Sequence, residues 1–403
     1  MADSLFPPSR AEALRRLAHF IPKAGSAYAA GRNTDSGPDQ QGAVSKLSPY
    51  LRYRLLTEQE TVAEVLGRHS LTAAEKFVQE VLWRTYWKGW LEMRPEIWSR
   101  YLAGRDADRE RFHDTHALAD AEAGRTGIEG FDDWARELVT TGYLHNHARM
   151  WFASIWVFTL RLPWTLGADF FLRHLIDADP ASNTLSWRWV AGLQTPGKTY
   201  LARADNIAHY TDGVHAPESG QLASAPLNLK EEPLPKVAAW TEDAAAVALL
   251  PMYERVGLWL HPEDLAVEQG ELARLKLTTI NASWPTLLAV RAGWSDKVST
   301  WTQAALRDGA TRAGSHFGAE VAAEETSDLA MTLVAWAQRN HLQAIVAYRP
   351  FIGPWLAEAL ALETALATAG IRVIWRRRAW DTEHFPHATR GYFPFWEKIK
   401  SAQ

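Results

Sequence analysis

The spacing of apolar residues changes near residue 215 of this 403-residue chain, and the change predicts two folding units. Before residue 215, apolar residues recur every three to four positions, as in amphipathic helices. Just after it, Pro, Ser, Ala, Glu and Lys predominate, which is typical of a linker. Short apolar runs of strand length follow. We therefore expect an all-helical domain at 1–215, a linker at 216–245 and an α/β domain at 246–403.

Capping signals locate helices in the first half. Thr57 with Glu60, and Thr72 with Glu75, form Thr-x-x-Glu capping boxes. The charged, glycine-interrupted stretch 103–130 predicts a loop with a short helix. The expected helices span residues 10–21, 57 onward, 72–95, 131–141, 144–160, 166–176 and 180–192. No segment of this half has the pattern of a strand.

Three short apolar runs in the second half predict buried strands: Val256–Leu260, Ala344–Ala347 and Arg372–Trp375. An amphipathic helix at Pro354–Thr368, followed by Gly370, separates the last two. Strand, helix and strand in this order form a βαβ unit, so we expect a doubly wound parallel sheet. Neither GxGxxG nor GxxxxGK[ST] occurs, so no dinucleotide or NTP motif is indicated.

The composition excludes several chemistries. The chain has no cysteine, which excludes disulfides, thiolate zinc sites, cysteine-ligated iron–sulfur clusters and a thiol nucleophile. The net charge is −4, so any basic groove for a polyanion must be local. The start lacks the pattern of a secretory leader, and the longest apolar stretch, Met150–Leu160, is too short to span a bilayer. We expect a cytoplasmic protein with no membrane partner.

Three polar segments are candidates for chemistry. Ser45–Leu51 (SKLSPYL) starts a helix, with Ser48 expected at the N-cap and Pro49 at the first helical position. Its free amides would suit a phosphate, although a plain capped helix is the favoured explanation. His145 and His147 lack nearby carboxylates, so we expect no metal site. Asp177–Asn183 (DADPASN) would suit a ribose or a flavin ring, whereas a helix cap beside an aromatic core is the alternative.

Together, SKLSPYL, WRTYW, TGYLHNHARM and LIDADPASNTLSWRWVAG, in this order, resemble the flavin-binding helical domain of the photolyase–cryptochrome family. The resemblance covers about residues 10–215. The family binds FAD in a U-shaped conformation and uses blue light. Its photolyases transfer an electron from the excited, reduced flavin to a pyrimidine dimer that is flipped out of DNA.

The resemblance implies which residues hold FAD. Tyr28 stands where the family has a tyrosine near the cofactor. Asn183 matches the amide that faces flavin N5 and tunes its redox state. The matches around the pyrophosphate, adenine, ribose and ring are Ser45, Leu47, Ser48, Arg84, Asn146, Asp177 and Asp179.

The resemblance also implies an electron path and a substrate pocket. Trp187 and Trp164 match the first two members of the electron-transfer chain. A carboxyl could read a thymine edge, and indoles with a thioether give a flipped base apolar walls. The matches to dimer-contacting residues are Glu80, Trp83, Met150 and Trp189. The candidates for contacts with DNA phosphates are Arg32, Arg149, Lys198 and Arg203.

Three positions depart from the family pattern. The third tryptophan of the usual chain should fall near Arg111 or Phe112, where none stands. His147 replaces an arginine that meets DNA phosphate, and Phe77 stands where dimer photolyases commonly have tryptophan. Another aromatic residue, such as Trp151, Trp156 or Trp134, would have to carry the last electron step, or photoreduction would be slow.

The order of the domains is also unusual. The family places an α/β antenna domain before the helical domain, whereas here an α/β domain follows it. Val256–Leu265, with its Trp259 and Asp264, looks like the opening strand and turn of that antenna domain, and Tyr392–Trp396 looks like its end. We interpret this half as a circularly permuted antenna-type domain, and an unrelated α/β domain is the alternative. The sequence indicates no particular antenna chromophore.

These observations leave three hypotheses. The first is an FAD-dependent deoxyribodipyrimidine photo-lyase that acts as a monomer on DNA carrying cyclobutane pyrimidine dimers. The second is a cryptochrome-like blue-light receptor that binds FAD, does not repair DNA and signals through a partner. The third is a redox flavoprotein with no role for light.

Overall fold

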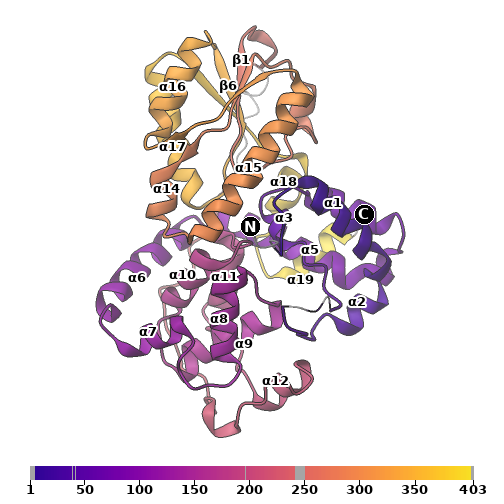
Figure 1. Cartoon of the computed structure of the whole chain (residues 1–403), viewed down its shortest axis with the longest axis vertical. Coiled ribbons are helices and arrows are strands. Elements are labelled where there is room, and N and C mark those ends of the chain that lie inside the picture. Colours follow the sequence, from indigo (N-terminus) through magenta and orange to yellow (C-terminus); the bar gives the residue numbers. More distant parts are fainter. Residues whose placement is uncertain (1–4, 39, 41, 196, 241–249, 401–403) are drawn as a thin grey trace.

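The structure is a computed structural model that describes residues 5–38, 40, 42–195, 197–240 and 250–400. Figure 1 shows an all-helical part at the bottom and a sheet with flanking helices at the top. The elements of the helical part are α1 (Arg10–Phe20), α2 (Ser26–Gly31), α3 (Ser48–Arg52), α4 (Glu58–Leu66), α5 (Leu71–Glu92), α6 (Glu96–Phe112), α7 (His116–Ala123), α8 (Phe131–Thr141), α9 (Asn146–Ser154), α10 (Trp164–His174), α11 (Pro180–Val190) and α12 (Ala204–Tyr210). A π-helical turn, Ile155–Thr159, continues α9.

The expectation of a loop at 103–130 is wrong, because most of this stretch lies in α6 and α7. α6 buries only Ile97 and Tyr101, so it has almost no apolar period to detect. An exposed ion pair between Glu96 and Arg100, one turn apart, supports it instead. Similarly, α5 begins earlier than the expected Thr72 box, because the Ser70 hydroxyl accepts the Ala73 N–H.

The second half contains the expected parallel sheet. Five parallel strands lie in the order β4-β2-β1-β6-β7, and the three expected strands are the adjacent β1, β6 and β7. The sequence pattern missed β2 and β4, because each has only three residues and β4 is an exposed edge. The strands are β1 (Val256–Trp259), β2 (Thr279–Asn281), β4 (Glu320–Ala322), β6 (Ala344–Tyr348) and β7 (Arg372–Arg376). This half also contains a small second sheet, formed by β3 (Trp284–Pro285) and β5 (Glu325–Thr326). Its helices are α14 (Thr286–Arg291), α15 (Asp296–Phe317), α16 (Leu329–Arg339) and α17 (Pro354–Thr368). The expected fold class is confirmed.

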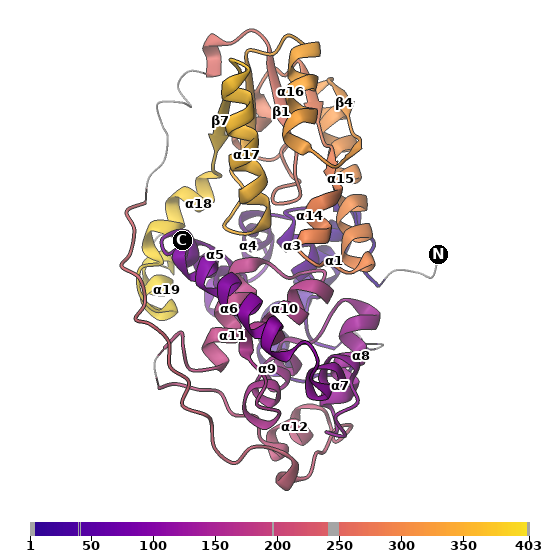
Figure 2. The same ribbon diagram turned by 90° about the vertical axis from the view of Figure 1, so that its left-hand side faces the viewer.

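After β7 the chain leaves the sheet and returns to the helical half. α18 (Ala379–His384), the turn Phe385–His387 and α19 (Tyr392–Lys400) lie along α5 (Figure 2). Gly89 of α5 permits this approach, because a Cβ there would lie 2.8 Å from the Cα of Phe385. The last elements of the chain therefore cover a helix of the first half.

The connection between the halves runs along the outside of the molecule, from α12 towards β1 (Figure 2). Glu231 forms an ion pair with Arg188 of α11, and the Ala238 N–H donates to the Met93 carbonyl at 2.9 Å. Residues 241–245 of the expected linker lie outside the described residues. The domain limits 1–215, 216–245 and 246–403 remain predictions.

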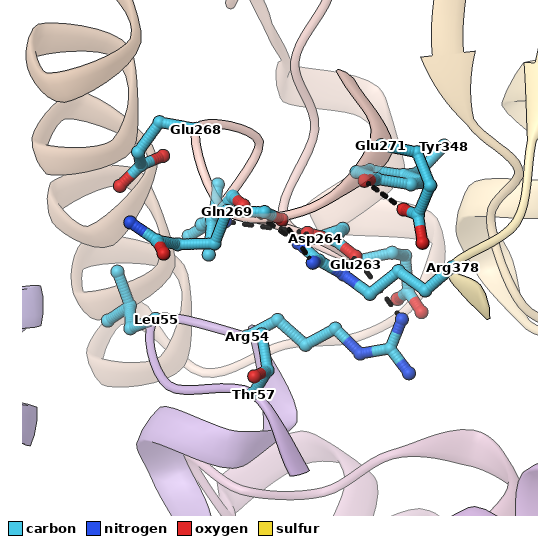
Figure 3. A network of polar contacts seen from close by, with 12 residues as sticks. Arg54, Leu55, Thr57, Glu263, Asp264, Glu268, Gln269, Glu271, Tyr348 and Arg378 are labelled. Atoms are coloured by element: carbon cyan, nitrogen blue, oxygen red, sulfur yellow. Dashed lines mark hydrogen bonds and ion pairs between the residues drawn. The ribbon is translucent and has the colours of Figure 1, made fainter. Parts of the chain in front are cut away.

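A buried polar network joins the two halves (Figure 3). Arg54, only 1% exposed, donates to Asp381 at 2.6 and 2.8 Å, to Glu58 at 3.1 Å and to Asp264 at 3.2 Å. Arg378 shares Asp264 through two bonds of 2.6 Å. Arg54 and Glu58 belong to the helical half, whereas the other members follow residue 250. The network therefore fixes how the halves meet.

Candidate functional site

Asp179 organises the N-terminus of α11. Its Oδ1 accepts the Ser182 N–H at 2.7 Å, as expected of an N-cap, and its Oδ2 forms an ion pair with Arg84 of α5. Burial alone would raise the pKa of Asp179, but Arg84, Lys88 and Arg52 together hold it below its ordinary value. The carboxylate is therefore ionised and surrounded by three cations.

Asp177 lies beside it and is held by Arg149. The Arg149 Nη2 donates to Asp177 Oδ2 at 2.8 Å, and its Nε donates to the Leu144 carbonyl at 2.9 Å. Burial acts to lower the pKa of Arg149, but Asp177 raises it overall. The other oxygen, Asp177 Oδ1, is buried with no hydrogen-bond partner among the described residues. It remains an acceptor for a bound group. Arg149, expected at a DNA phosphate, is engaged inside the protein.

Asn183 and Trp187 follow on the same face of α11, one turn apart. Asn183 Nδ2 donates to the Ala168 carbonyl at 2.8 Å, which leaves its oxygen available. The Trp187 ring packs on α10, where a Cβ at Gly167 would lie 2.3 Å from the ring. Trp164 stands one turn before Gly167 on the same helix. The structure thus places the two expected electron carriers, Trp164 and Trp187, on two helices that pack against each other.

The expected pyrophosphate segment precedes α3. Lys46 has a positive φ of 51°, so the chain turns sharply between the two serines. The Leu47 N–H donates to Ser45 Oγ at 3.3 Å, and Ser48 begins the helix rather than capping it. Lys46 Nζ donates to the Gln40 carbonyl at 2.9 Å. Ser45 and Ser48 are partly exposed.

Tyr28 is buried, with its ring perpendicular to the rings of Phe20 and Phe77 at 5.8 and 5.3 Å. Arg32, on the next turn, forms an ion pair with Glu80. Burial raises the pKa of Tyr28, and the charge of Glu80 adds to this effect. Tyr28 and Glu80 are therefore neighbours, although the sequence assigned one to the cofactor and the other to the substrate.

The expected dimer-contacting residues already have partners in this chain. Trp83 stacks on Tyr392 of α19, with ring centroids 3.7 Å apart. Trp189 packs on Tyr200 at 5.8 Å. Met150 is partly buried on α9. The structure therefore places a residue from the end of the chain on one wall of the expected pocket.

The remaining expected residues lie at the surface. Asn146 is exposed at the first position of α9, and Lys198 is exposed after α11. Arg203 forms an ion pair with Asp205, and both side chains are exposed. These residues are accessible to a partner in solution.

His145 has a structural role. Its Nδ1 accepts the His147 N–H at 3.2 Å, and its Nε2 lies 3.1 Å from the Arg32 carbonyl, which fits a neutral ring with hydrogen on Nε2. Burial lowers the pKa of His145 to about 4. The described residues contain no group of three or more His, Cys, Asp or Glu that could hold a metal ion.

Lys88 and Tyr392 are neighbours of the site that the sequence analysis missed. Lys88 is one turn beyond Arg84 on α5, so helical spacing could have revealed it. Its Nζ is buried 3.6 Å from Glu58 Oε1 and 4.1 Å from the centre of the Phe351 ring. No sequence signal could have revealed Tyr392, since over 300 residues separate it from Trp83.

The residues present fit FAD. Besides Asp177 Oδ1, Arg52 Nη1 and Lys88 Nζ are buried without hydrogen-bond partners among the described residues. Arg52 Nε donates to the Ala178 carbonyl, so these unsatisfied groups surround the 177–179 segment. Cationic donors suit a diphosphate, and carboxylate and amide oxygens suit ribose hydroxyls and ring N–H groups. A small hollow lined by Lys88, Asp179 and Phe351 adjoins this region.

Comparisons with known proteins find similarity over part of this chain. Residues 77–212 match the family described as "FAD binding domain of DNA photolyase". A deoxyribodipyrimidine photo-lyase from Streptomyces griseus is 35% identical over 178 residues, which cover 41% of this chain and 38% of the relative. One from Alkalihalophilus pseudofirmus is 31% identical over 190 residues, which cover 47% and 39%. A class III photolyase structure from Agrobacterium tumefaciens aligns over 50% of this chain and 42% of its own, with 28% identity and a TM-score of 0.43.

The helical half thus contains a segment, residues 77–212, that is similar to the FAD-binding domain of DNA photolyase, and FAD is the cofactor that this segment fits. The chain spans about two fifths of the length of the curated relatives it matches.

Proposed function

We propose that this protein is an FAD-dependent, blue-light-driven photolyase that repairs cyclobutane pyrimidine dimers in DNA. One observation carries the proposal: the segment that matches the photolyase domain supplies a set of buried and partly buried polar side chains around the N-terminus of α11. These are Arg84, Arg149, Asp177, Asp179 and Asn183. Relatives that match this segment are named deoxyribodipyrimidine photo-lyase, which supports the same activity here.

The side chains of the site have distinct roles in this proposal. FAD would supply the light-excited electron that splits the dimer. Arg149 holds Asp177, whose free Oδ1 would accept a hydrogen bond from the cofactor. Asn183, anchored through Nδ2 by the Ala168 carbonyl, would present its oxygen to the flavin ring. Dimer splitting is redox-neutral, so this electron would return to FAD, and Trp187 would serve the light-driven reduction of oxidised FAD before repair. Tyr28, Ser45, Leu47, Ser48 and Asn146 would complete the cofactor contacts.

The substrate contacts are part of the same proposal. Glu80 would accept a hydrogen bond from a thymine edge, after release from Arg32. Trp83, Met150 and Trp189 would provide apolar walls. Arg203 and Lys198 are exposed and would meet flanking phosphates, with few contacts and marked salt sensitivity.

We further propose that the protein acts as a monomer and that the α/β half is a permuted antenna-type domain, as its five parallel strands suggest. Among the described residues, no helix is long and apolar enough to cross a membrane.

The test is light-dependent repair of an oligonucleotide with one thymine dimer, by the reduced, FAD-loaded full chain at low salt. We expect repair under blue light and none in the dark. Glu80→Gln should reduce it, and Asn183→Ala should nearly abolish it while FAD stays bound. Glu64→Gln, at an exposed position of α4, is the matched control and should leave repair unchanged. FAD-loaded protein that neither binds nor repairs the oligonucleotide would contradict the proposal.

A second candidate is a blue-light receptor that binds FAD without repairing DNA. The observation that favours it is the Tyr392 ring lying on Trp83, since this ring occupies the face that a flipped base would use. The engagement of Arg32 with Glu80 adds to this. The same assay separates the candidates, because a receptor would be photoreduced and would change its proteolysis pattern in light but would leave the dimer intact.

A further inference from the structure

The sequence indicates an electron-transfer chain but leaves it without a third tryptophan at the surface. The structure assigns a surface end to this chain, which is called the exit because the electron vacancy leaves the chain there. We propose that electrons enter from the surface at Trp98 and reach Trp164 through the ring of Tyr101. This inference rests on the proposed function, since it concerns how the light-driven cofactor of that site is re-reduced.

Three aromatic rings form a continuous row between α10 and α6, which pack side by side. The ring centroids of Trp164 and Tyr101 are 5.7 Å apart, and those of Tyr101 and Trp98 are 5.1 Å apart. Tyr101 and Trp98 are three residues apart and share one face of α6. Trp164 and Tyr101 are buried, whereas Trp98 is partly exposed. The row therefore leads from the interior to solvent.

The position expected for a third tryptophan cannot serve. Arg111 is not oxidisable, and Phe112 beneath it is far harder to oxidise than an indole. Both lie at the other end of α6 from Trp98. The path from Trp164 thus turns toward the N-terminal end of the helix.

The three tryptophans expected to replace it are poor exits. Trp156 contacts Trp187 at 6.3 Å, but it is fully buried, its Nε1 donates to the Pro163 carbonyl, and its other ring neighbours are phenylalanines. Trp151 and Trp134 stack on each other at 5.4 Å, and both indoles are buried. An electron vacancy on any of these indoles would stay enclosed.

The release of a proton determines which residue keeps the electron vacancy. An oxidised tyrosine must release its phenolic proton, but the Tyr101 hydroxyl is buried with no hydrogen-bond partner among the described residues. Burial and the nearby Asp169 also raise the pKa of Tyr101. Tyr101 therefore conducts electron transfer between Trp98 and Trp164 but does not hold a long-lived radical. The partly exposed Trp98 can lose its indole proton to water.

When FAD is bound and excited by light, it would take one electron from Trp187. One electron would then pass from Trp164 to Trp187, and one from Trp98 to Trp164 through Tyr101. Trp98 is oxidised by one electron and gives its Nε1 proton to water. A thiol reductant in solution then returns one electron and one proton to Trp98.

The experiment uses the FAD-loaded full chain and follows light-induced radicals by transient absorption and by electron paramagnetic resonance. We expect wild type to give a long-lived, deprotonated tryptophan radical, and both Trp98→Phe and Trp164→Phe to lose it. Tyr101→Phe keeps the ring and should retain most of it. Trp294→Phe, a partly exposed tryptophan of the α/β half, is the matched control. In cofactor-free protein, Trp98→Phe should also lower the fraction of fluorescence quenched by acrylamide.

The outcomes separate the two proposals. If wild type with bound FAD gives no tryptophan radical, the exit at Trp98 is overturned, whereas the proposed function is judged separately by light-dependent repair of the thymine dimer. If wild type and Trp98→Phe give the same radical yield while Trp164→Phe loses it, the exit at Trp98 is overturned and the function stands. Loss in Trp156→Phe with none in Trp98→Phe, or complete loss in Tyr101→Phe, would equally overturn it.

Discussion

The ring of Tyr392 lies on the ring of Trp83, with centroids 3.7 Å apart and planes 9° from parallel. The Tyr392 hydroxyl donates to the Gln79 carbonyl at 2.7 Å, so the tyrosine is fixed on α5 by a stack and a hydrogen bond. If Trp83 faces a flipped base, Tyr392 must move when DNA binds.

We therefore expect Tyr392→Ala to bind dimer-containing DNA more tightly than wild type, measured by fluorescence anisotropy at low salt. It should also lower the free energy of unfolding by about 3–5 kcal/mol, because a buried aromatic ring is removed. Tyr392→Phe keeps the stack and should lose only about 0.5–1.5 kcal/mol, with unchanged DNA affinity. Equal DNA affinity in all three proteins would show that Tyr392 does not gate Trp83.

Gly167 lies where α10 packs against the ring of Trp187. A Cβ there would lie 2.3 and 2.4 Å from ring atoms, so Gly167→Ala must displace the indole or the helix. We expect lower FAD occupancy and slower photoreduction, with a stability loss of about 1–3 kcal/mol from overpacking. Gly220→Ala, where an added Cβ meets nothing within 4 Å, is the control. FAD absorbance per protein and urea unfolding measure both effects, and unchanged photoreduction in Gly167→Ala would refute the contact.

His145 predicts a pH dependence of stability. Its pKa is about 4 in the folded protein and about 6.5 when unfolded, so the unfolded state binds more protons between these values. The contribution of His145 to stability should fall as the pH drops from 6.5 to 4 and should level off below 4. His145→Asn keeps a capping side chain and removes the titration. We expect the slope to shrink by at most about 1.4 kcal/mol per pH unit.

Urea unfolding at several pH values measures this slope. His341→Asn is the control, because His341 is exposed and its positive φ of 50° suits asparagine. An unchanged slope in His145→Asn would mean that other groups dominate in this pH range.

Arg54 neutralises three buried carboxylates, so Arg54→Met should leave Glu58, Asp264 and Asp381 short of a partner. We expect a loss of about 3–5 kcal/mol and faster proteolysis between the two halves. Arg54→Met with Asp381→Asn should recover part of this loss, because one of the uncompensated charges is gone. A double variant no more stable than the single variant would contradict the coupling.

Local chemistry explains why much of the fold was predictable. Thr57 and Asp179 cap helices where their sequence context indicates, and β6, α17 and β7 follow the expected strand–helix–strand order. The polar helix α6 was missed, because its stability comes from ion pairs rather than an apolar face. A motif also located the cluster around α11, since its members lie close in sequence.

Contacts between distant segments were not predictable. The sequence around Arg54 is typical of a surface arginine, because its partners Asp264 and Asp381 lie far away in the chain. Likewise, nothing near Trp83 in the sequence indicates that Tyr392 stacks on it. The row from Trp164 to Trp98 depends on how α6 packs on α10. Each of these features requires tertiary packing that no local pattern encodes.

The return of α18 and α19 to α5 has a consequence for synthesis on the ribosome. Residues 71–92 leave the exit tunnel early, but the residues that cover them, Phe385 and Tyr392 among them, are made about 300 residues later. During that interval Trp83, Tyr86 and Gly89 lack the contacts that Tyr392 and Phe385 make with them in the folded protein. The newborn chain therefore carries an exposed aromatic surface for most of its translation, and this surface is where chaperones would bind or where nascent chains would aggregate.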